Sequence, residues 1–114
     1  MTDIDLRYDA ESDALVAKQV GATIVRSVSV GDLTLDIGDE ERVVGMQVLN
    51  ASDIVEFSDD IADSRRFLEH LDTASLQTRY HEDGVIVLLR LQGEVSGTQQ
   101  EARISSMAPA VGTA

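Results

Sequence analysis

The chain of 114 residues contains no cysteine and no tryptophan, one proline and one lysine. Without cysteine it forms no disulfide, has no thiol nucleophile and offers no thiolate ligand to zinc. Aromatic residues make up only 4% of the chain, so aliphatic side chains must fill the core. Apolar residues still reach 43%, which is typical of a folded chain and argues against global disorder.

Basic residues are also scarce. Nine Lys and Arg stand against 21 Asp and Glu, which gives a formal net charge of −12. A surface this acidic repels phosphate groups, so we expect neither a nucleic acid nor a membrane as a partner. Two interpretations of the charge stay open. In the first, the acidic surface keeps a halophile-like protein solvated in concentrated salt. In the second, the acidic surface attracts a basic protein partner.

Long apolar runs are missing as well. No segment approaches the roughly 18 apolar residues that a membrane-spanning helix needs. The first nine residues, MTDIDLRYD, are acidic and lack the apolar core of a secretory signal. Together with the absence of cysteine, this predicts a cytoplasmic location. The length fits one domain, which we place at residues 1–106, with a disordered tail at 107–114 that contains the only proline.

The clearest signal that is present is a pair of alternating runs, 33–37 and 44–48, on either side of an acidic turn at 38–41. A period of two places one face of each strand on a core and the other in water. Similar runs before this hairpin predict three further strands, the third containing Arg26 on its apolar side and therefore lying at an edge or bending there. Residues 6–56 are thus predicted to form an antiparallel meander of about five strands.

The period changes after residue 50. Apolar residues recur at spacings of three and four, and Ser58 precedes two acidic residues, which predicts an amphipathic helix over 58–73 that packs on the sheet. Further strands follow over 76–105, with a hairpin turn at Glu82-Asp83-Gly84. The predicted fold class is α+β: an antiparallel β-sheet meander with one amphipathic helix packed on it, then a C-terminal β-hairpin.

The run 85–91 is almost entirely apolar. We expect a central strand with both faces buried. In so small a domain, such a strand favours a homo-oligomer, most simply a dimer.

Two groups of residues are candidates for chemistry. Asp9, Glu11 and Asp13 have the alternate spacing of calcium ligands, but an EF-hand loop would need Gly at Ala14 and Glu at Val20. A solvated acidic turn is the commoner meaning of such a cluster.

The second candidate, His81, Glu82 and Asp83, lies at a predicted turn, where polar residues are common without any ligand. A zinc site needs three or four ligands, and the chain has two His. We therefore expect no metal and no cofactor. A hydrolase would pair the carboxylates of 9–13 with His81, but no nucleophile motif or phosphate-binding loop accompanies them.

Two stretches carry a resemblance to a known family. Residues 8–15, YDAESDAL, resemble the opening motif of domain-of-unknown-function family 2283, and residues 44–52, VGMQVLNAS, resemble its closing motif. The resemblance covers roughly residues 6–56. Ala10 stands where the family often has Pro, and Gln47 where it often has Glu. The resemblance implies a fold without an assigned reaction and, because some members are encoded beside toxin-like proteins, a companion role.

These observations predict a non-catalytic interaction or regulatory module rather than an enzyme. One alternative is an acidic, antitoxin-like companion that binds a basic protein partner. The other is a carboxylate-based hydrolase or metal-binding protein. Fold alone does not choose among them.

Overall fold

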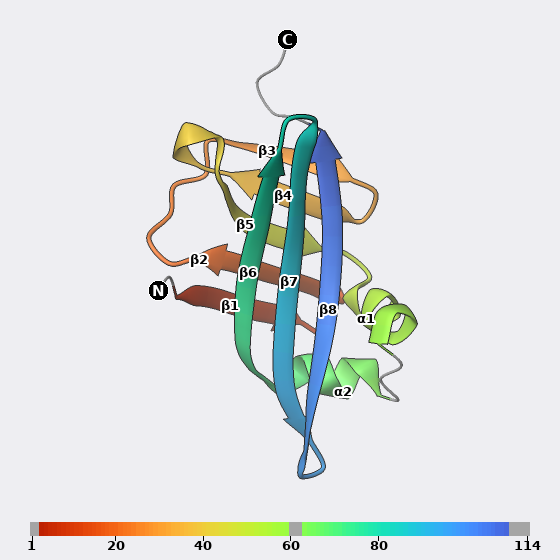
Figure 1. Ribbon diagram of the computed structural model, residues 1–114. Coiled ribbons are helices and arrows are strands. Elements are labelled where there is room, and N and C mark those ends of the chain that lie inside the picture. The colour runs from red at the N-terminus through yellow and green to blue at the C-terminus, as the bar shows by residue number, and fades with distance from the viewer. Residues whose placement is uncertain (1–2, 60–62, 110–114) are drawn as a thin grey trace.

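The computed structural model describes residues 3–59 and 63–109, which form two antiparallel sheets and two short helices (Figure 1). Sheet A contains β1 (Ile4–Asp9), β2 (Ala14–Gln19), β3 (Arg26–Val30), β4 (Leu33–Ile37) and β5 (Val43–Val48). Sheet B contains β6 (Leu71–His81), β7 (Gly84–Val95) and β8 (Thr98–Pro109). The remaining elements are the 3₁₀ turn η1 (Asp39–Glu41) and the helices α1 (Ala51–Asp59) and α2 (Ser64–Glu69).

The predicted hairpin is confirmed, since β4 and β5 pair antiparallel. The predicted meander is wrong in its order, which is β1-β2-β5-β4-β3. Strand β5 is buried at five of its six positions, and it therefore lies in the centre, where both of its edges find a partner. Strand β3 is exposed at four of five positions and lies at the edge, as Arg26 suggested.

Sheet B is a three-stranded sheet of long strands rather than a hairpin. A two-residue turn at Glu82 and Asp83 joins β6 to β7, close to the predicted position. The turn from β7 to β8 uses Ser96 (φ 53°) and Gly97 (φ +80°). Two successive residues with positive φ are what a type I′ hairpin turn requires. Sequence alternation along β7 then sets which residues face sheet A.

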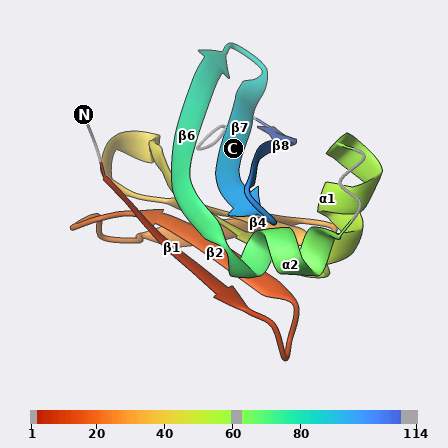
Figure 2. The ribbon, with the colours of Figure 1, turned by 90° about the horizontal axis from the view of Figure 1, so that it is seen from below.

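The two sheets pack face to face, with the strands of sheet B running across those of sheet A (Figures 1 and 2). Fully buried side chains from both inner faces fill the space between them: Leu15, Leu35, Met46 and Val48 from sheet A, and Val87, Leu89 and Leu91 from sheet B. Tyr80 of β6 also joins the sheets, because its hydroxyl accepts a hydrogen bond from the Val43 amide at 2.9 Å.

The predicted α+β fold, with one helix covering a meander, is therefore wrong. The protein is mostly β, and sheet B, rather than a helix, covers the inner face of sheet A. The predicted helix 58–73 is replaced by α1 and α2, with residues 60–62 outside the described part, and Leu71 already begins β6. The apolar spacing that suggested one long helix places only Phe67 and Leu68 of α2 in the core.

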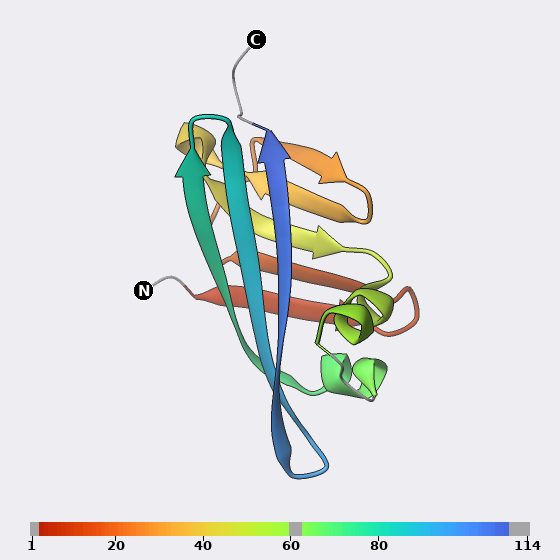
Figure 3. The ribbon, with the colours of Figure 1, turned by 45° about the vertical axis from the view of Figure 1, so that its right-hand side comes forward.

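Helices α1 and α2 lie together at one end of the sheet A strands, beside β8 (Figure 3). Ala51 and Val55 of α1 are fully buried there. Neither helix in the described part of the chain is long and apolar enough to cross a membrane. The helices therefore close one end of the space between the sheets.

Two smaller expectations also need correction. Strand β8 continues to Pro109, so residues 107–109 belong to a strand and not to the predicted tail, while 110–114 lie outside the described residues. Strand β7 is central in its sheet, as predicted, but only one of its faces is buried. Ile86 points to the other face and is 40% exposed.

Candidate functional site

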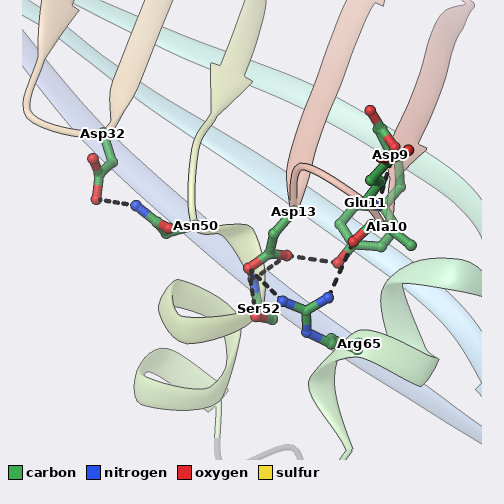
Figure 4. Close-up of polar contacts among 9 residues, drawn as sticks. Asp9, Ala10, Glu11, Asp13, Asp32, Asn50, Ser52 and Arg65 are labelled. Atoms are coloured by element: carbon green, nitrogen blue, oxygen red, sulfur yellow. Dashed lines mark hydrogen bonds and ion pairs between the residues drawn. The ribbon is translucent and has the colours of Figure 1, made fainter.

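The most heavily hydrogen-bonded side chain described is that of Asp13, in the turn between β1 and β2. Its carboxylate accepts hydrogen bonds from the Tyr8 hydroxyl at 2.6 Å and from the Ser52 hydroxyl at 2.6 Å. The Ser52 amide adds contacts of 3.1 and 3.3 Å to the two carboxylate oxygens. Only 7% of Asp13 is exposed. Figure 4 shows the carboxylate turned towards the start of α1.

Asp13 caps α1 although it is distant in sequence. Its backbone carbonyl accepts from the Ala51 amide at 3.0 Å, and its side chain accepts from the Ser52 amide. The first amides of a helix have no partner within the helix, and its N-terminal end carries a partial positive charge. Asp13 therefore satisfies two helix amides, one with its backbone carbonyl and one with its side chain, and its negative charge is favourable next to the partial positive charge of the helix end.

Arg65 of α2 completes the arrangement. Its Nη2 lies 3.8 Å from the Asp13 carboxylate, and its Nη1 donates to the Ala10 carbonyl at 3.1 Å (Figure 4). We call Tyr8, Asp13, Ser52 and Arg65 the Asp13 clasp. The clasp joins the β1–β2 turn to both helices, which are not neighbours of that turn in sequence.

The clasp fixes the protonation states of two of its members. Burial acts to raise the pKa of Asp13, but hydrogen bonds from Ser52 and Tyr8 and the charge of Arg65 outweigh it and lower that pKa below its ordinary value. Burial raises the pKa of Tyr8, and the hydrogen bond to the anionic Asp13 raises it further. At neutral pH Asp13 is therefore ionised and Tyr8 is protonated, and neither is tuned for proton transfer near pH 7.

The predicted acidic cluster separates into two parts. Asp9 accepts from the Glu11 amide at 3.1 Å and from the Ser12 hydroxyl at 2.9 Å, which is the local turn that the sequence suggested. Asp9 and Glu11 are exposed, whereas Asp13 is buried in the clasp. The three carboxylates therefore do not converge as calcium ligands would.

The second predicted group, His81, Glu82 and Asp83, is exposed at the end of β6 and the turn that follows. Ten residues of β6, about 33 Å of extended chain, separate His81 from Leu71 at the α2 end. A hydrolytic pairing of His81 with residues 9–13 is therefore not formed (Figure 1). Within residues 3–59 and 63–109, no group of three His, Asp or Glu side chains is arranged to hold a metal ion.

A second buried carboxylate lies in sheet A. Asp36 is 1% exposed and accepts from the Ser27 hydroxyl at 2.9 Å and from the Gln47 amide at 3.0 and 3.2 Å. It lies beside Gly45, where a β-carbon would come within 3.2 Å of Asp36 Oδ2 and 3.0 Å of the Ala17 carbonyl. Gly45 therefore permits a close approach of the neighbouring strand that a larger residue would not allow.

Sequence reasoning named Asp13 but missed Tyr8, Ser52 and Arg65. The signal for two of them lay in the motifs themselves. Tyr8 and Asp13 belong to the stretch 8–15, and Ser52 ends the stretch 44–52. The two motifs that carry the family resemblance therefore meet in space at the Asp13 carboxylate. Arg65 lies outside both motifs, and nothing in its local sequence indicates the contact.

A surface hollow of ≈ 530 Å³ lies between η1 and β6. Its lining consists of Gln19, Glu40, Glu41, Arg42, Val43, Thr78 and Tyr80. Tyr80 is 51% exposed, and Glu40 forms an ion pair with Arg42 at 3.8 Å. The hollow thus combines an aromatic ring with carboxylates at its rim.

Comparison with protein families matches residues 5–52 to the family described as "Protein of unknown function (DUF2283)". The resemblance seen in the two motifs is confirmed, and the matched region ends at Ser52, the partner of Asp13. No curated protein and no solved structure matches the chain.

Proposed function

Since residues 5–52 match the family described as a protein of unknown function (DUF2283), we propose that the chain is a non-catalytic interaction or regulatory module. The observation that carries this proposal is the use of the motif residues in the Asp13 clasp. Their polar atoms bond to one another and to a helix terminus. They hold the fold together, so the Asp13 carboxylate and the hydroxyls of Tyr8 and Ser52 are engaged in structural hydrogen bonds.

Exposed strand edges and apolar side chains support an interaction role. The strands β1, β3, β6 and β8 each pair on one side only. Free edges and exposed apolar side chains are the features through which sheets recruit other chains. Ile86 and Met107, which are 40% and 68% exposed, lie on the same face of sheet B. A cytoplasmic location remains a prediction from the sequence.

Hydrolysis assays test the non-catalytic part of the proposal. The full chain is incubated with p-nitrophenyl acetate and bis-p-nitrophenyl phosphate, with and without Mg²⁺, Mn²⁺ or Zn²⁺. We expect no turnover above that of heat-denatured protein. Turnover that is lost in a folded Asp13→Asn variant would contradict the proposal and favour the carboxylate-based hydrolase or metal-binding alternative.

A second candidate function, an acidic companion of a basic protein, is favoured by the hollow at Glu40 and Tyr80. A cationic side chain placed there would contact carboxylates and an aromatic face, and the net charge of −12 would speed its approach. We expect the immobilised chain to retain a basic protein that elutes with salt.

The matched variants Glu40→Lys and Asp83→Lys make the same charge change at exposed positions. If the hollow binds the partner, Glu40→Lys abolishes retention and Asp83→Lys preserves it. Equal loss in both variants would show that only the overall charge matters.

A further inference from the structure

The outer face of sheet B, turned away from sheet A, carries basic side chains in roughly the same number as acidic ones. By strand alternation it carries Arg79, Arg90 and Arg103 against the acidic residues Glu94 and Glu101. The whole chain has a net charge of −12. A second copy can approach this face without the repulsion that the remaining surface would impose.

The same face is partly apolar. Ile86 is 40% and Met107 68% exposed, and the two residues are cross-strand neighbours. Ile86 lines a hollow of ≈ 380 Å³, together with Gln77, Thr78, Arg79 and Leu88. Leu88, two residues along β7 from Ile86, is only half-buried. The face therefore offers apolar side chains and a depression that receives such side chains from another surface.

The charges on this face are arranged in a self-complementary way. Arg79 lies on β6 in register with Ile86, and Glu101 lies on β8 in register with Gln92. Six residues of β7, about 20 Å, separate these two levels along the strand. A cation and an anion thus occupy diagonally opposite corners of the face. In a two-fold interface, residue i of one copy meets residue j of the other and the reverse.

We propose that a second copy of this chain docks face to face on the outer face of sheet B, with Arg79 of each copy paired to Glu101 of the other. This deepens the proposed interaction role by naming one partner. The two-fold axis crosses the middle of the face, between Leu88 and Arg90 on β7. Leu88 packs near the axis, whereas Ile86 and Met107 lie further out, at the level of Arg79. Glu101 already lies 3.2 Å from Arg90 and 3.5 Å from Arg103, so it is held in place before the partner arrives.

The dimensions predict a modest interface. Three strands about 4.8 Å apart and 11 or 12 residues long cover on the order of 500 Å² in each copy. About 1,000 Å² in total is at the lower limit for a specific interface. We therefore expect a dimer that dissociates in the micromolar range. Molar KCl screens the general repulsion between two acidic copies, which opposes docking, and also the Arg79–Glu101 attraction, which favours it, so the dimer should persist at both salt concentrations.

Sedimentation equilibrium of the full chain from 1 to 200 µM, in low and molar KCl, tests the proposal. The expected mass rises with concentration to twice the 12.3 kDa of one chain. Arg79→Glu and Glu101→Arg each raise the dissociation constant at least tenfold, because like charges then meet. An equimolar mixture of these two variants restores the dimer, because every pair is again of opposite sign.

Arg7→Glu is the matched control, since Arg7 is on sheet A and its side chain is 80% exposed. It makes the same charge change as Arg79→Glu and leaves the dimer intact. Circular dichroism melts check folding, and if Glu101→Arg unfolds, Ile86→Asp replaces it as the second disruptive variant.

A monomeric mass at 200 µM in molar KCl overturns the proposal, and so does equal weakening by Arg7→Glu and Arg79→Glu. Either result leaves the proposed interaction role standing, because that role is tested separately by partner capture and by the hydrolysis assays.

Discussion

Asp13 combines two requirements that few residues satisfy together. Its backbone has a positive φ of 55°, a conformation that aspartate and asparagine tolerate better than most residues. Its carboxylate also caps α1 and contacts Arg65. The residue therefore closes the β1–β2 turn and, through the same side chain, positions both helices.

The variant Asp13→Asn tests how much the Asp13 clasp contributes to the stability of the fold. The amide keeps the size of the side chain but loses the charge, and it places a donor among groups that are themselves donors. We expect a loss of about 1–3 kcal/mol in the free energy of unfolding, measured by urea denaturation. The control Asp9→Asn removes an exposed turn carboxylate and should change stability by less than about 1 kcal/mol. Equal losses would mean that the clasp contributes nothing specific.

The depressed pKa of Asp13 also predicts a pH dependence. A carboxyl group whose pKa is lower in the folded than in the unfolded chain contributes stability above its unfolded pKa, near 3.8. That contribution is lost as the pH falls below 3.8 and through the folded value. We expect the wild-type chain to lose more stability than Asp13→Asn between pH 5 and pH 2, in urea titrations at each pH. Parallel curves for the two proteins would contradict this.

At the scale of elements, the sequence was informative wherever the signal was local. Strict alternation located β4 and β5, and the acidic composition of residues 9–13 indicated the turn that joins β1 to β2. Features set by distant contacts were missed. The position of β5 between β2 and β4 depends on which strands pair along both of their edges, and that is decided by residues far apart in the sequence. The Asp13–Ser52 contact spans 39 residues, a distance that no local pattern reports.

The change from helix to strand near Leu71 was missed for a related reason. Apolar spacing of three and four continued from α2 into the first residue of β6, and the same residues satisfy both patterns over so short a stretch. Strand pairing decides between helix and strand here, because residues 71–81 pair with β7 along the whole length of β6. An expected helix thereby became the first strand of a second sheet.

The pairing of β4 with β5 supports a prediction at the scale of elements. Gln47 donates from its amide to Asp36, which is buried. Gln47→Glu would place two carboxylates about 3 Å apart, and at neutral pH they would repel. We expect a loss of about 1–3 kcal/mol at pH 7, measured by urea denaturation. The deficit should shrink as the pH is lowered, because two carboxyl groups this close favour a shared proton. A deficit that is constant with pH would show that shape, not charge, causes it.

At the scale of the whole molecule, charge opposes the compact state. The small chain contains 21 acidic and nine basic residues, and the ion pairs at Arg7, Arg42 and Arg103 are largely exposed. Such pairs each contribute little. The mutual repulsion of the excess carboxylates is therefore not cancelled locally, and its size depends on the ions in solution.

Salt should stabilise this protein for that reason. The screening length falls from about 10 Å at 0.1 M to about 3 Å at 1 M, so repulsion between separated carboxylates almost disappears. We expect the thermal midpoint, followed by circular dichroism, to rise by several degrees between 0.1 and 2 M KCl. A variant with three exposed acids neutralised, Glu11→Gln, Glu40→Gln and Asp83→Asn, should start higher and respond less. If the midpoint of the wild-type chain does not rise, self-repulsion does not limit stability, and the acidic surface is better explained by a basic partner.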